Sequence, residues 1–396
     1  MRQLLLLRIH WLSFITERIT NLMRIKEKNK KIKILLVIYG DVHFGGVSVL
    51  INNLLAKMDR SRLDITLYAF GNVADEGCYR FYEENGVKIV LGEHDRYRRK
   101  LIAWDLLRII AKGKFDVIHC NTGGLELTFI SMAIARVFGV KKRIAHSHGS
   151  KRSSVPYGRR EQFYQRANDR LANIQLSCSV EAAQHLFGHS DVRLLYNGID
   201  LNKFTFSSDL RKKARSSMEL DGKFVIGTVG RLDYIKNQKF IFDIVKILKE
   251  KSEVRALIVG SGSFKDELVK YSEELEIEES IIFIDANDRI EYYLCAMDAF
   301  VFPSLSEGLG ISAIEAQAMD LPVWSSTNVP RKAAVTEKAF FMDLEDGAGK
   351  WADDIFEYCQ CHDLENRYDR SIDIRKKGYD ICDSAKVLHD IYLDRK

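Results

Sequence analysis

The stretch that decides the fold is residues 299–322, AFVFPSLSEGLGISAIEAQAMDLP. Its first four residues form an uncharged apolar run, which is typical of a strand buried on both faces. After the glycines, apolar residues recur at helical spacing, at Ile311, Ile314 and Ala318. The stretch therefore predicts a strand that turns through glycines into a helix, the repeating unit of a parallel sheet covered by helices.

Two glutamates stand eight residues apart in this stretch, Glu307 in the loop and Glu315 about one turn into the helix. The backbone N–H groups near Gly308 and Gly310, at the helix start, favour an anion such as a phosphate. The carboxylates would accept hydrogen bonds from hydroxyls on either side of that anion. A nucleotide sugar has this layout, because its diphosphate joins a sugar to a ribose. The alternative is an ordinary strand, loop and helix with two surface glutamates.

The same alternation of elements extends over the chain from residue 32 onward. Short runs rich in apolar and aromatic residues alternate with stretches of helical spacing, which predicts parallel sheets with helices on both faces. The expected strands are residues 32–39, 64–70, 87–91, 115–120, 142–147, 174–178 and 192–196, then 224–229, 255–259, 280–284, 299–302, 322–326 and 339–342. The expected helices include residues 47–58, 100–112, 125–138, 159–172, 237–251, 264–275, 289–297, 311–319 and 384–393. A polar bridge at 207–222 separates two doubly wound domains, with a ligand cleft between the carboxyl ends of their strands.

Composition is that of a soluble globular protein with room for two domains: 396 residues, 46% hydrophobic and 29% charged. The net charge of +5 is uneven, because residues 1–33 hold nine Lys or Arg and two Glu, which leaves the remainder slightly acidic. This distribution argues against nucleic acid as the main partner. The seven cysteines are scattered without zinc-site spacing, so we expect free thiols in a reducing cytosol.

The N-terminal segment has apolar residues at helical spacing over 4–25, with arginines between them. Its apolar run is too short to span a bilayer and lacks a signal-peptide cleavage site. The pattern suits a helix lying at the surface of an anionic membrane. A helix packed on the protein, or a poorly ordered extension, is the alternative.

Charged residues and glycines follow the first two strands of the second half. Arg231 ends the first of these strands, and Lys236 comes five residues later. Two fixed cations there would stabilise a diphosphate leaving group, at ~3 kcal/mol for each well-placed donor. Gly260 ends the next strand in a Val-Gly-Ser-Gly turn, which we interpret as structural, with its backbone near the nucleotide. Lys265 stands where a dinucleotide fingerprint has its third glycine, so a dehydrogenase is not expected.

In the first half, Gly45 and Gly46 follow the first strand and allow close approach of the backbone to a ligand. A plain helix N-terminus is the alternative. His148 follows the strand at 142–147 and is expected in the cleft, whereas His146 is expected to point inward. A nearby group of basic residues would contact an acceptor phosphate, an anionic lipid or only solvent: Lys151, Arg152, Arg159, Arg160 and Arg166.

Taken together, these motifs resemble the retaining glycosyltransferases of family four, over about residues 32–396. The Asn-Gly-Ile-Asp at 197–200 also matches the family, and we interpret it as architectural. The resemblance implies the GT-B fold, two Rossmann-like domains facing a central cleft, with the last helix crossing back to the first domain. Leu309 replaces the family's usual aromatic residue, which would alter the sugar pocket, and Asp320 replaces the usual Gly. The implied parts are an N-terminal extension (1–31), an acceptor domain (32–206), a donor domain (207–378) and the returning helix (379–396).

The resemblance also implies residue roles. His148 and Glu307 would act in catalysis at the transferred sugar, and Glu315 would bind the ribose. The donor-binding residues that it implies are Gly45, Gly46, Arg231, Lys236, Gly260, Gly308, Leu309, Gly310, Ile311 and Glu315. The chain contains no Asp-x-Asp sequence. We therefore expect no metal and no cofactor, with cations and helix N-termini acting on the diphosphate instead.

The expected function is transfer of a sugar, with retention, from a nucleotide sugar (a UDP-sugar by expectation) to a lipid-linked saccharide. The expected setting is bacterial surface-polysaccharide or capsule synthesis, with the enzyme on the cytoplasmic face of the cell membrane. Two alternatives remain open at this point. One is a nucleotide-sugar 2-epimerase of the same fold, and the other is a catalytically silent partner of a second transferase.

Overall fold

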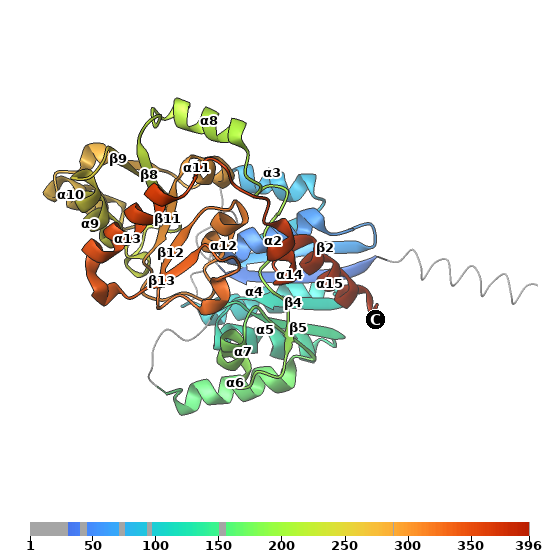
Figure 1. Ribbon diagram of the computed structural model, residues 1–396. Helices are drawn as coiled ribbons and strands as arrows, with labels where there is room; N and C mark the ends of the chain where they lie inside the picture. The colour runs from blue at the N-terminus through green and yellow to red at the C-terminus, as the bar shows by residue number, and fades with distance from the viewer. Residues whose placement is uncertain are drawn as a thin grey trace, which may run out of the picture.

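The computed structural model describes residues 31–39, 46–70, 76–92, 97–149, 156–287 and 289–395, with side chains from residue 80 in the third range. These residues form two parallel sheets, one in each half of the chain, each covered by helices (Figure 1). No helix within these ranges combines the length and the apolar character needed to cross a bilayer. The predicted membrane-surface helix at 4–25 lies outside the described residues, as does Gly45.

The first half, as described, contains seven parallel strands in the order β3-β2-β1-β4-β5-β6-β7. They are β1 (Ile32–Tyr39), β2 (Leu63–Phe70), β3 (Lys88–Gly92), β4 (Val117–Asn121), β5 (Lys142–Ser147), β6 (Ile174–Ser177) and β7 (Arg193–Leu194). The helices are α2 (Gly46–Lys57), α3 (Glu76–Glu84), α4 (Arg99–Gly113), α5 (Leu125–Val137), α6 (Arg159–Leu171) and α7 (Val180–Phe187). The strand order reverses between β1 and β4, the switch point at which such sheets bind ligands.

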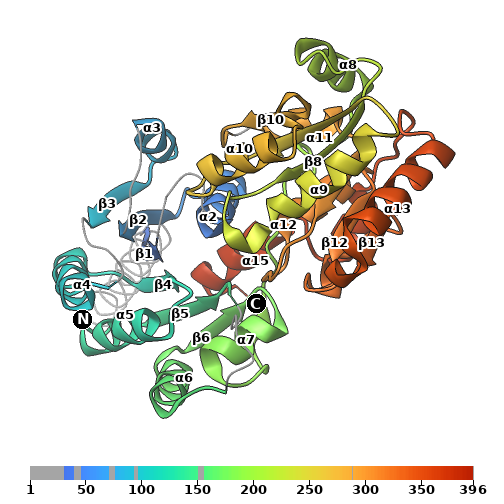
Figure 2. The same cartoon turned by 90° about the vertical axis from the view of Figure 1, so that its left-hand side faces the viewer.

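Both faces of this sheet are buried, and β1 shows how. Ile34 and Leu36 pack with α2 in one apolar core, whereas Leu35 and Val37 pack with α4 and α5 in another. The alternation follows from the two-residue period of a strand. In Figure 2, α4, α5 and α6 line the side of the first sheet that is remote from the second sheet.

The second half, as described, contains six parallel strands in the order β10-β9-β8-β11-β12-β13. They are β8 (Phe224–Val229), β9 (Val254–Val259), β10 (Ile281–Ile284), β11 (Ala299–Phe302), β12 (Val323–Ser326) and β13 (Ala339–Met342). The helices are α8 (Ser208–Ser217), α9 (Gln238–Lys249), α10 (Lys265–Glu274), α11 (Ile290–Ala296), α12 (Ile311–Ala318), α13 (Gly347–Cys361) and α14 (Ser371–Lys376), with short 3-10 turns η1 (Tyr234–Lys236), η2 (Glu278–Ser280), η3 (Arg331–Ala333) and η4 (Leu344–Asp346). Here the strand order reverses between β8 and β11.

The last helix, α15 (Ile381–Leu393), returns to the first half and packs against α2, as expected (Figure 1). Asp380 caps the helix, since its carboxylate accepts a hydrogen bond from the backbone N–H of Cys382 at 2.8 Å. The chain before α15 passes so close to Gly198 that an added Cβ there would lie 2.6 Å from the nitrogen of Ile381. The glycine of the Asn-Gly turn therefore permits the crossing.

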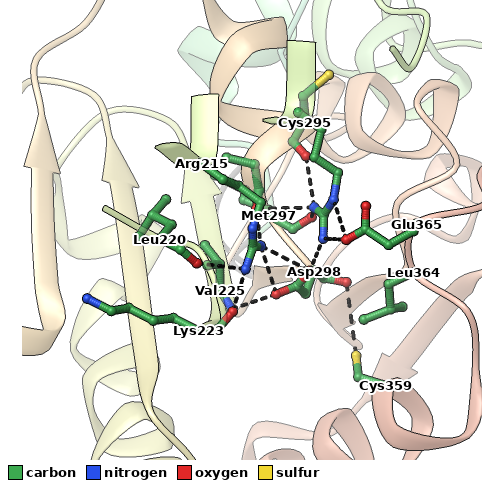
Figure 3. A network of polar contacts seen from close by, with 12 residues as sticks. Arg215, Leu220, Lys223, Val225, Cys295, Met297, Asp298, Cys359, Leu364 and Glu365 are labelled. Carbon is green, nitrogen blue, oxygen red and sulfur yellow. Dashed lines mark hydrogen bonds and ion pairs between the residues drawn. The ribbon is translucent and has the colours of Figure 1, made fainter. Parts of the chain in front are cut away.

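A charged network closes the amino ends of β8 and β11 (Figure 3). Arg211 and Arg215 of α8 both reach Asp298, which immediately precedes β11, with N–O distances of 2.6 and 3.3 Å. Arg211 also pairs with Glu365 at 2.7 Å, and Asp298 accepts a hydrogen bond from the backbone of Val225 at 2.8 Å. The interpretation of residues 207–222 as a polar bridge was therefore wrong, because the segment contains a helix whose two arginines are buried by partners distant in sequence.

One departure from the family pattern also has a structural reason. Asp320 has a left-handed backbone, with φ of +56°, in the turn after α12. This is a conformation that glycine adopts most readily. The Asp320 carboxylate is buried between Lys338 at 2.7 Å and Arg370 at 2.6 Å. These two hydrogen-bonded cations hold its pKa below the usual value despite burial, so the side chain stabilises the turn as an anion.

Candidate active site

An ion pair joins Lys236 and Glu307 at the carboxyl end of the second sheet. Nζ of Lys236 lies 2.6 Å from Oε1 of Glu307, and the two side chains are 21% and 12% exposed. The same ammonium lies 4.9 Å from the ring centroid of Phe302, a cation–π contact. Lys236 follows β8 and Glu307 follows β11, so the pair sits at the switch point of this sheet. The structure thus brings two of the predicted site residues into direct contact.

The loops that carry this pair are tied to each other. The Asp233 carboxylate accepts a hydrogen bond from the backbone N–H of Lys236 at 3.2 Å and pairs with Nε of Arg231 at 2.9 Å. The N–H of Leu305, in the loop after β11, donates to the carbonyl of Ile235 at 2.7 Å. The side chain of Arg231 remains 66% exposed. Both predicted cations therefore lie in a segment that hydrogen bonds hold to the neighbouring loop, and the Arg231 side chain is open to solvent.

Gly260 allows the turns after β8 and β9 to touch backbone to backbone. Its φ is +149°, and an added Cβ would lie 1.9 Å from the carbonyl oxygen of Gly230. The N–H of Gly230 in turn donates to the carbonyl of Val259 at 2.9 Å. No side chain fits here, so the predicted structural role of Gly260 agrees with the geometry, beside the loop that carries Arg231.

The start of α12 is open to an anion. Gly310 precedes the helix with φ of +86°, and an added Cβ would lie 3.0 Å from the ring of Phe302. The first turn, from Ile311, has no acidic side chain and no side-chain cap. Its N–H groups and helix dipole therefore favour negative charge. Leu309 is only 5% exposed and packs in the core of the second half.

Glu315 lies about 6 Å along the axis of α12 from the first helical residue and is partly buried. Desolvation raises the pKa of its carboxyl to about 8, an effect that Lys203 opposes and Glu291 reinforces. Lys203 lies in the segment that connects the two halves, and Glu291 lies on α11, away from the Lys236–Glu307 pair. The two glutamates of the motif therefore occupy different environments.

His148 faces the second half from the end of β5. Its carbonyl oxygen is 3.5 Å from the place that a Cβ would take at Gly308, so the absence of a side chain there lets the two halves approach. Nε2 of His148 lies 2.9 Å from Oδ1 of Asn121, at the end of β4. Burial lowers the pKa of His148 to about 4, although the Asn197 side chain opposes the shift. The imidazole is therefore neutral at physiological pH.

Two further histidines connect His148 to the returning helix. The ring of His146 lies against that of His148, with centroids 3.9 Å apart and the ring planes tilted by 43°. Nδ1 of His146 lies 3.3 Å from Nε2 of His119, whose Nδ1 lies 2.6 Å from the hydroxyl of Tyr392 on α15. Burial lowers the pKa of His119 to about 3 and that of His146 well below its ordinary value. A neutral chain of rings thus joins α15 to the end of β5.

Most of the predicted site residues lie on the loops at the facing ends of the two sheets. Gly46 is the first residue of α2, and Gly45 falls outside the described residues. His146 is buried as expected, but it packs on His148. Residues that sequence reasoning missed are Asn121, His119 and Tyr392, and Asn197 had been given only an architectural role. Asn121 could have been found as a polar residue at the end of the strand next to β5.

Two family models match the chain and together span most of it. Residues 44–203 match the model described as Glycosyltransferase Family 4, and residues 210–368 match the model described as Glycosyl transferases group 1. The boundary between the two matches falls before α8, where the second half begins.

Named relatives and solved structures agree with these matches. EpsF of Bacillus subtilis (strain 168), named as a glycosyltransferase, is 25% identical over 389 residues, which is 92% of this chain and 97% of EpsF. The Escherichia coli UDP-Gal:alpha-D-GlcNAc-diphosphoundecaprenol alpha-1,3-galactosyltransferase is 27% identical over 232 residues, which is 55% of this chain and 59% of that protein. Anabaena HepE, crystallised with UDP-glucose, superimposes with a TM-score of 0.64 over 91% of this chain and 95% of HepE, at 19% identity. The last likeness shows a shared fold.

Proposed function

The chain belongs to the family-four glycosyltransferases of GT-B fold, and on that premise we propose that it transfers a sugar with retention from a UDP-sugar to a lipid-linked saccharide. The observation that carries the proposal is the Lys236–Glu307 pair beside the open N-terminus of α12. Cations, a helix N-terminus and carboxylates at one switch point suit an anionic linker with hydroxyls at both ends.

The donor diphosphate would lie between Arg231, Lys236 and the first turn of α12. As the bond to the sugar breaks, negative charge grows on the departing diphosphate, and these groups stabilise it without reorganising. In the free protein Glu307 neutralises Lys236, so donor binding would replace that contact with the phosphate and release the carboxylate toward the sugar. We propose that this positive frame takes the place of a metal ion.

The ribose would lie against Glu315, at the other end of the donor. A carboxyl group with a pKa of about 8 is largely protonated at neutral pH. Two ribose hydroxyls that donate to the ionised form would lower this pKa, because hydrogen bonds to a carboxylate favour its charged state. Binding of the nucleotide and loss of the Glu315 proton are therefore coupled.

His148 would approach the sugar from the first half. Its imidazole is neutral, and its Nδ1 has no hydrogen-bond partner among the described residues. A sugar hydroxyl could donate to this nitrogen. The acceptor would attack from the face on which the diphosphate leaves, which preserves the configuration. Approach of the two halves at Gly308 would exclude water and favour transfer over hydrolysis.

The acceptor class rests on relatives. The Escherichia coli galactosyltransferase is named for a diphosphoundecaprenol-linked acceptor, and another relative, of Campylobacter jejuni, is named for a diphospho-undecaprenol acceptor as well. We propose that this chain acts in surface-polysaccharide synthesis on a similar acceptor at the cytoplasmic face of the membrane. The basic segment 1–31 supports membrane attachment through its charge.

The test is a panel of radiolabelled UDP-sugars and GDP-sugars, assayed for slow hydrolysis and for transfer to extracted lipid-linked saccharides. We expect release of UDP from one donor, and loss of that activity in Glu307→Gln with an unchanged thermal unfolding midpoint. Absence of hydrolysis and of binding for every nucleotide sugar would overturn the proposal. An epimerised nucleotide sugar formed from donor alone would point to a 2-epimerase instead.

A further inference from the structure

Asn121 is a buried asparagine at the end of β4, beside the candidate catalytic histidine. It is 2% exposed and pairs with Ile38 of β1, so it lies at the switch point of the first sheet. A buried amide needs hydrogen-bond partners for both its oxygen and its nitrogen. The partners of Asn121 come from its own strand and from His148.

The two hydrogen bonds of Asn121 fix the direction in which its amide points. Its Nδ2 donates to the backbone carbonyl of His119, on the same strand, at 3.4 Å. Its Oδ1 therefore faces Nε2 of His148, at 2.9 Å. An amide oxygen only accepts hydrogen bonds, so this contact requires a proton on Nε2. A neutral imidazole has one ring proton, and with that proton on Nε2 the Nδ1 atom keeps its lone pair.

A second asparagine competes for the same ring proton. Asn197, near the point where the chain leaves the first half, is 7% exposed, and its Oδ1 has no hydrogen-bond partner among the described residues. Its side chain acts on His148 as a hydrogen-bond acceptor, because it favours the charged form of the ring. A proton on Nδ1 would satisfy this oxygen and remove the lone pair. The hydrogen bond that the structure contains is the one to Asn121.

The ring of His148 is also confined by its neighbours. His146 packs against it, with centroids 3.9 Å apart, and Nδ1 of His146 lies 3.3 Å from Nε2 of His119 on β4. A ring confined in this way does not turn freely to exchange its two nitrogens. The position of its proton therefore depends on the acceptors that face each nitrogen.

We propose that Asn121 is a positioning residue for sugar transfer: it holds the ring proton of His148 on Nε2 and so presents the Nδ1 lone pair to a hydroxyl of the donor sugar. The inference rests on the proposed function, in which His148 approaches that sugar. It gives Asn121 no contact with the donor. Asn121 acts only through its neighbour, in the way that supporting hydrogen bonds hold a reacting group in its productive state.

A purely structural role is the alternative, because a buried amide also stabilises the end of a strand. Such a role predicts that substitution of Asn121 changes stability and nothing else. The proposed role also predicts changes in the tautomer of His148, in turnover and in the dependence of activity on pH. Each of these can be measured in the full-length protein.

The first measurement is the tautomer of His148 in the free protein, read from the ¹⁵N shifts of histidine-labelled protein. The signals of His148 are assigned by their absence from the spectrum of His148→Gln. In the parent the proton should lie on Nε2, and in Asn121→Ala it should move to Nδ1, facing Asn197. The matched control is Asn197→Ala, a buried asparagine on the other side of the same ring, which should leave the proton on Nε2.

The second measurement is donor hydrolysis. Asn121→Ala should lower the turnover about tenfold, because a hydrogen bond between the sugar and His148 is lost. Its affinity for UDP should stay unchanged, because UDP lacks the sugar. Asn168 of α6 offers the control, since it is fully buried and its Nδ2 donates to the carbonyl of Leu125 at 3.0 Å. Asn168→Ala should lose stability and keep its turnover.

Asn121→Asp keeps an acceptor at this position and provides a test even if Asn121→Ala does not fold. At about pH 8 its carboxylate should hold the proton on Nε2 and restore most of the turnover. A carboxylate beside the ring also favours the imidazolium, whose Nδ1 is protonated and cannot accept a hydrogen bond. In the parent, burial lowers the pKa of His148 to about 4. Acid loss of activity should therefore begin at a higher pH in Asn121→Asp than in the parent.

The other ionisable groups around His148 should not disturb this measurement. Burial lowers the pKa of His146 on β5 and that of His119 on β4, so both stay neutral. The loop of the second half that approaches His148 carries Glu307, which is paired with Lys236 at 2.6 Å. A shift in the acid limb of the activity profile would therefore report the introduced carboxylate.

Three results would overturn the proposal. One is a His148 proton that stays on Nε2 in Asn121→Ala, and another is a proton that moves while the turnover stays unchanged. The third is an acid limb in Asn121→Asp that coincides with that of the parent. Absence of donor hydrolysis in the parent would count against the proposed function alone, because the tautomer is read without a donor and decides by itself whether Asn121 sets it.

Discussion

Strands β8 and β11 lie side by side and carry a charged cluster at each end. At their amino ends, Arg211 and Arg215 both pair with Asp298. At their carboxyl ends, Lys236 pairs with Glu307, and Arg231 stands nearby. Both clusters join cations to carboxylates at the ends of the same two strands, so we compare them by the surroundings of their side chains.

The amino-end cluster is saturated. Arg211 is 2% exposed and donates to the carbonyls of Cys295 and Met297, each at 2.9 Å, besides its two carboxylate partners. The carboxyl-end cluster is more open to solvent, since the Arg231 side chain is two-thirds exposed. A charged group whose hydrogen-bond and ion-pair partners all lie within the fold has a structural role. A charged group that lacks such partners is a candidate for binding a ligand.

The largest expected effect breaks the saturated cluster. Asp298→Ala leaves two buried guanidinium groups without their common carboxylate and should lower the free energy of unfolding by about 3–5 kcal/mol. Urea denaturation followed by circular dichroism measures it. Asp353→Ala, at a surface ion pair with Lys251, is the matched control and should change stability by less than ~1 kcal/mol. A loss equally small in Asp298→Ala would mean that the amino-end cluster is not a structural element.

The opposite outcome is expected at the carboxyl ends. Lys236→Met should lower the turnover of donor hydrolysis about 10²–10³-fold, because a positive group aimed at the leaving diphosphate is lost. Its unfolding free energy should fall by less than that of Asp298→Ala, by about 1–2 kcal/mol, because Glu307 loses its partner but keeps some contact with water. Lys239→Met, three residues along and paired with Glu267 at the surface, should keep its activity. A Lys236 variant that is active but unstable would reverse the roles assigned to the two clusters.

The ionisation of Glu315 should make the stability of the protein depend on pH. Its carboxyl pKa is raised from 4.5 to about 8 in the folded state, so folding favours the protonated form. The protein is therefore most stable below about pH 4.5 with respect to this group, loses stability as the pH rises to 8, and changes no further above it. Glu315→Gln removes this loss and should stabilise the protein at pH 8.5 by about 1–2 kcal/mol. Thermal unfolding of both proteins at pH 6 and pH 8.5 measures the difference, and parallel pH dependences would contradict the assignment.

The same residue should act oppositely on ligand binding. If the ribose selects the ionised carboxylate, UDP affinity rises with pH up to about 8, and Glu315→Gln flattens this dependence while weakening binding about tenfold at pH 8. Isothermal titration across this pH range measures it. If Glu315→Gln stabilises the fold and also weakens UDP binding, Glu315 has a role in ligand binding and not in stability.

The carboxyl ends could be predicted from sequence because their signals are local. A buried apolar run that ends in glycine and a charged residue marks a strand end, and this rule located Arg231, Glu307 and Gly310. The repeated strand–helix pattern gave both sheets within a few residues at most strand ends. Glu315 was located by its spacing from Glu307, but its raised pKa depends on burial that no spacing reveals.

The amino-end cluster could not be predicted because its partners are distant in the chain. Arg211 and Asp298 are 87 residues apart, and a charged segment looks the same in sequence whether its side chains are solvated or buried. The histidine chain was missed for the same reason, since His119 and Tyr392 are separated by 273 residues. Fold-level resemblance implied that the last helix returns, but not that its tyrosine would meet a buried histidine.

The first half offers a third case, in which the partners near the site are neutral. Tyr392→Phe removes the hydroxyl beside Nδ1 of His119 and should cost about 1 kcal/mol of stability, the worth of one buried hydrogen bond. The histidine chain is neutral, so the substitution changes the orientation of the rings but removes no charge from the site. Donor hydrolysis by Tyr392→Phe should therefore fall less than tenfold. The tautomer of His119, read from its imidazole ¹⁵N shifts, should change, whereas Tyr271→Phe, which removes a similar hydrogen bond to Asp243 in the second half, should leave those shifts alone. Unchanged ¹⁵N shifts of His119 in Tyr392→Phe would mean that Tyr392 only packs against this histidine and does not set its tautomer. If Tyr392→Phe lost as much activity as Lys236→Met, a group with all its partners inside the fold would also be needed for activity. The distinction between structural and functional groups would then fail in the first half.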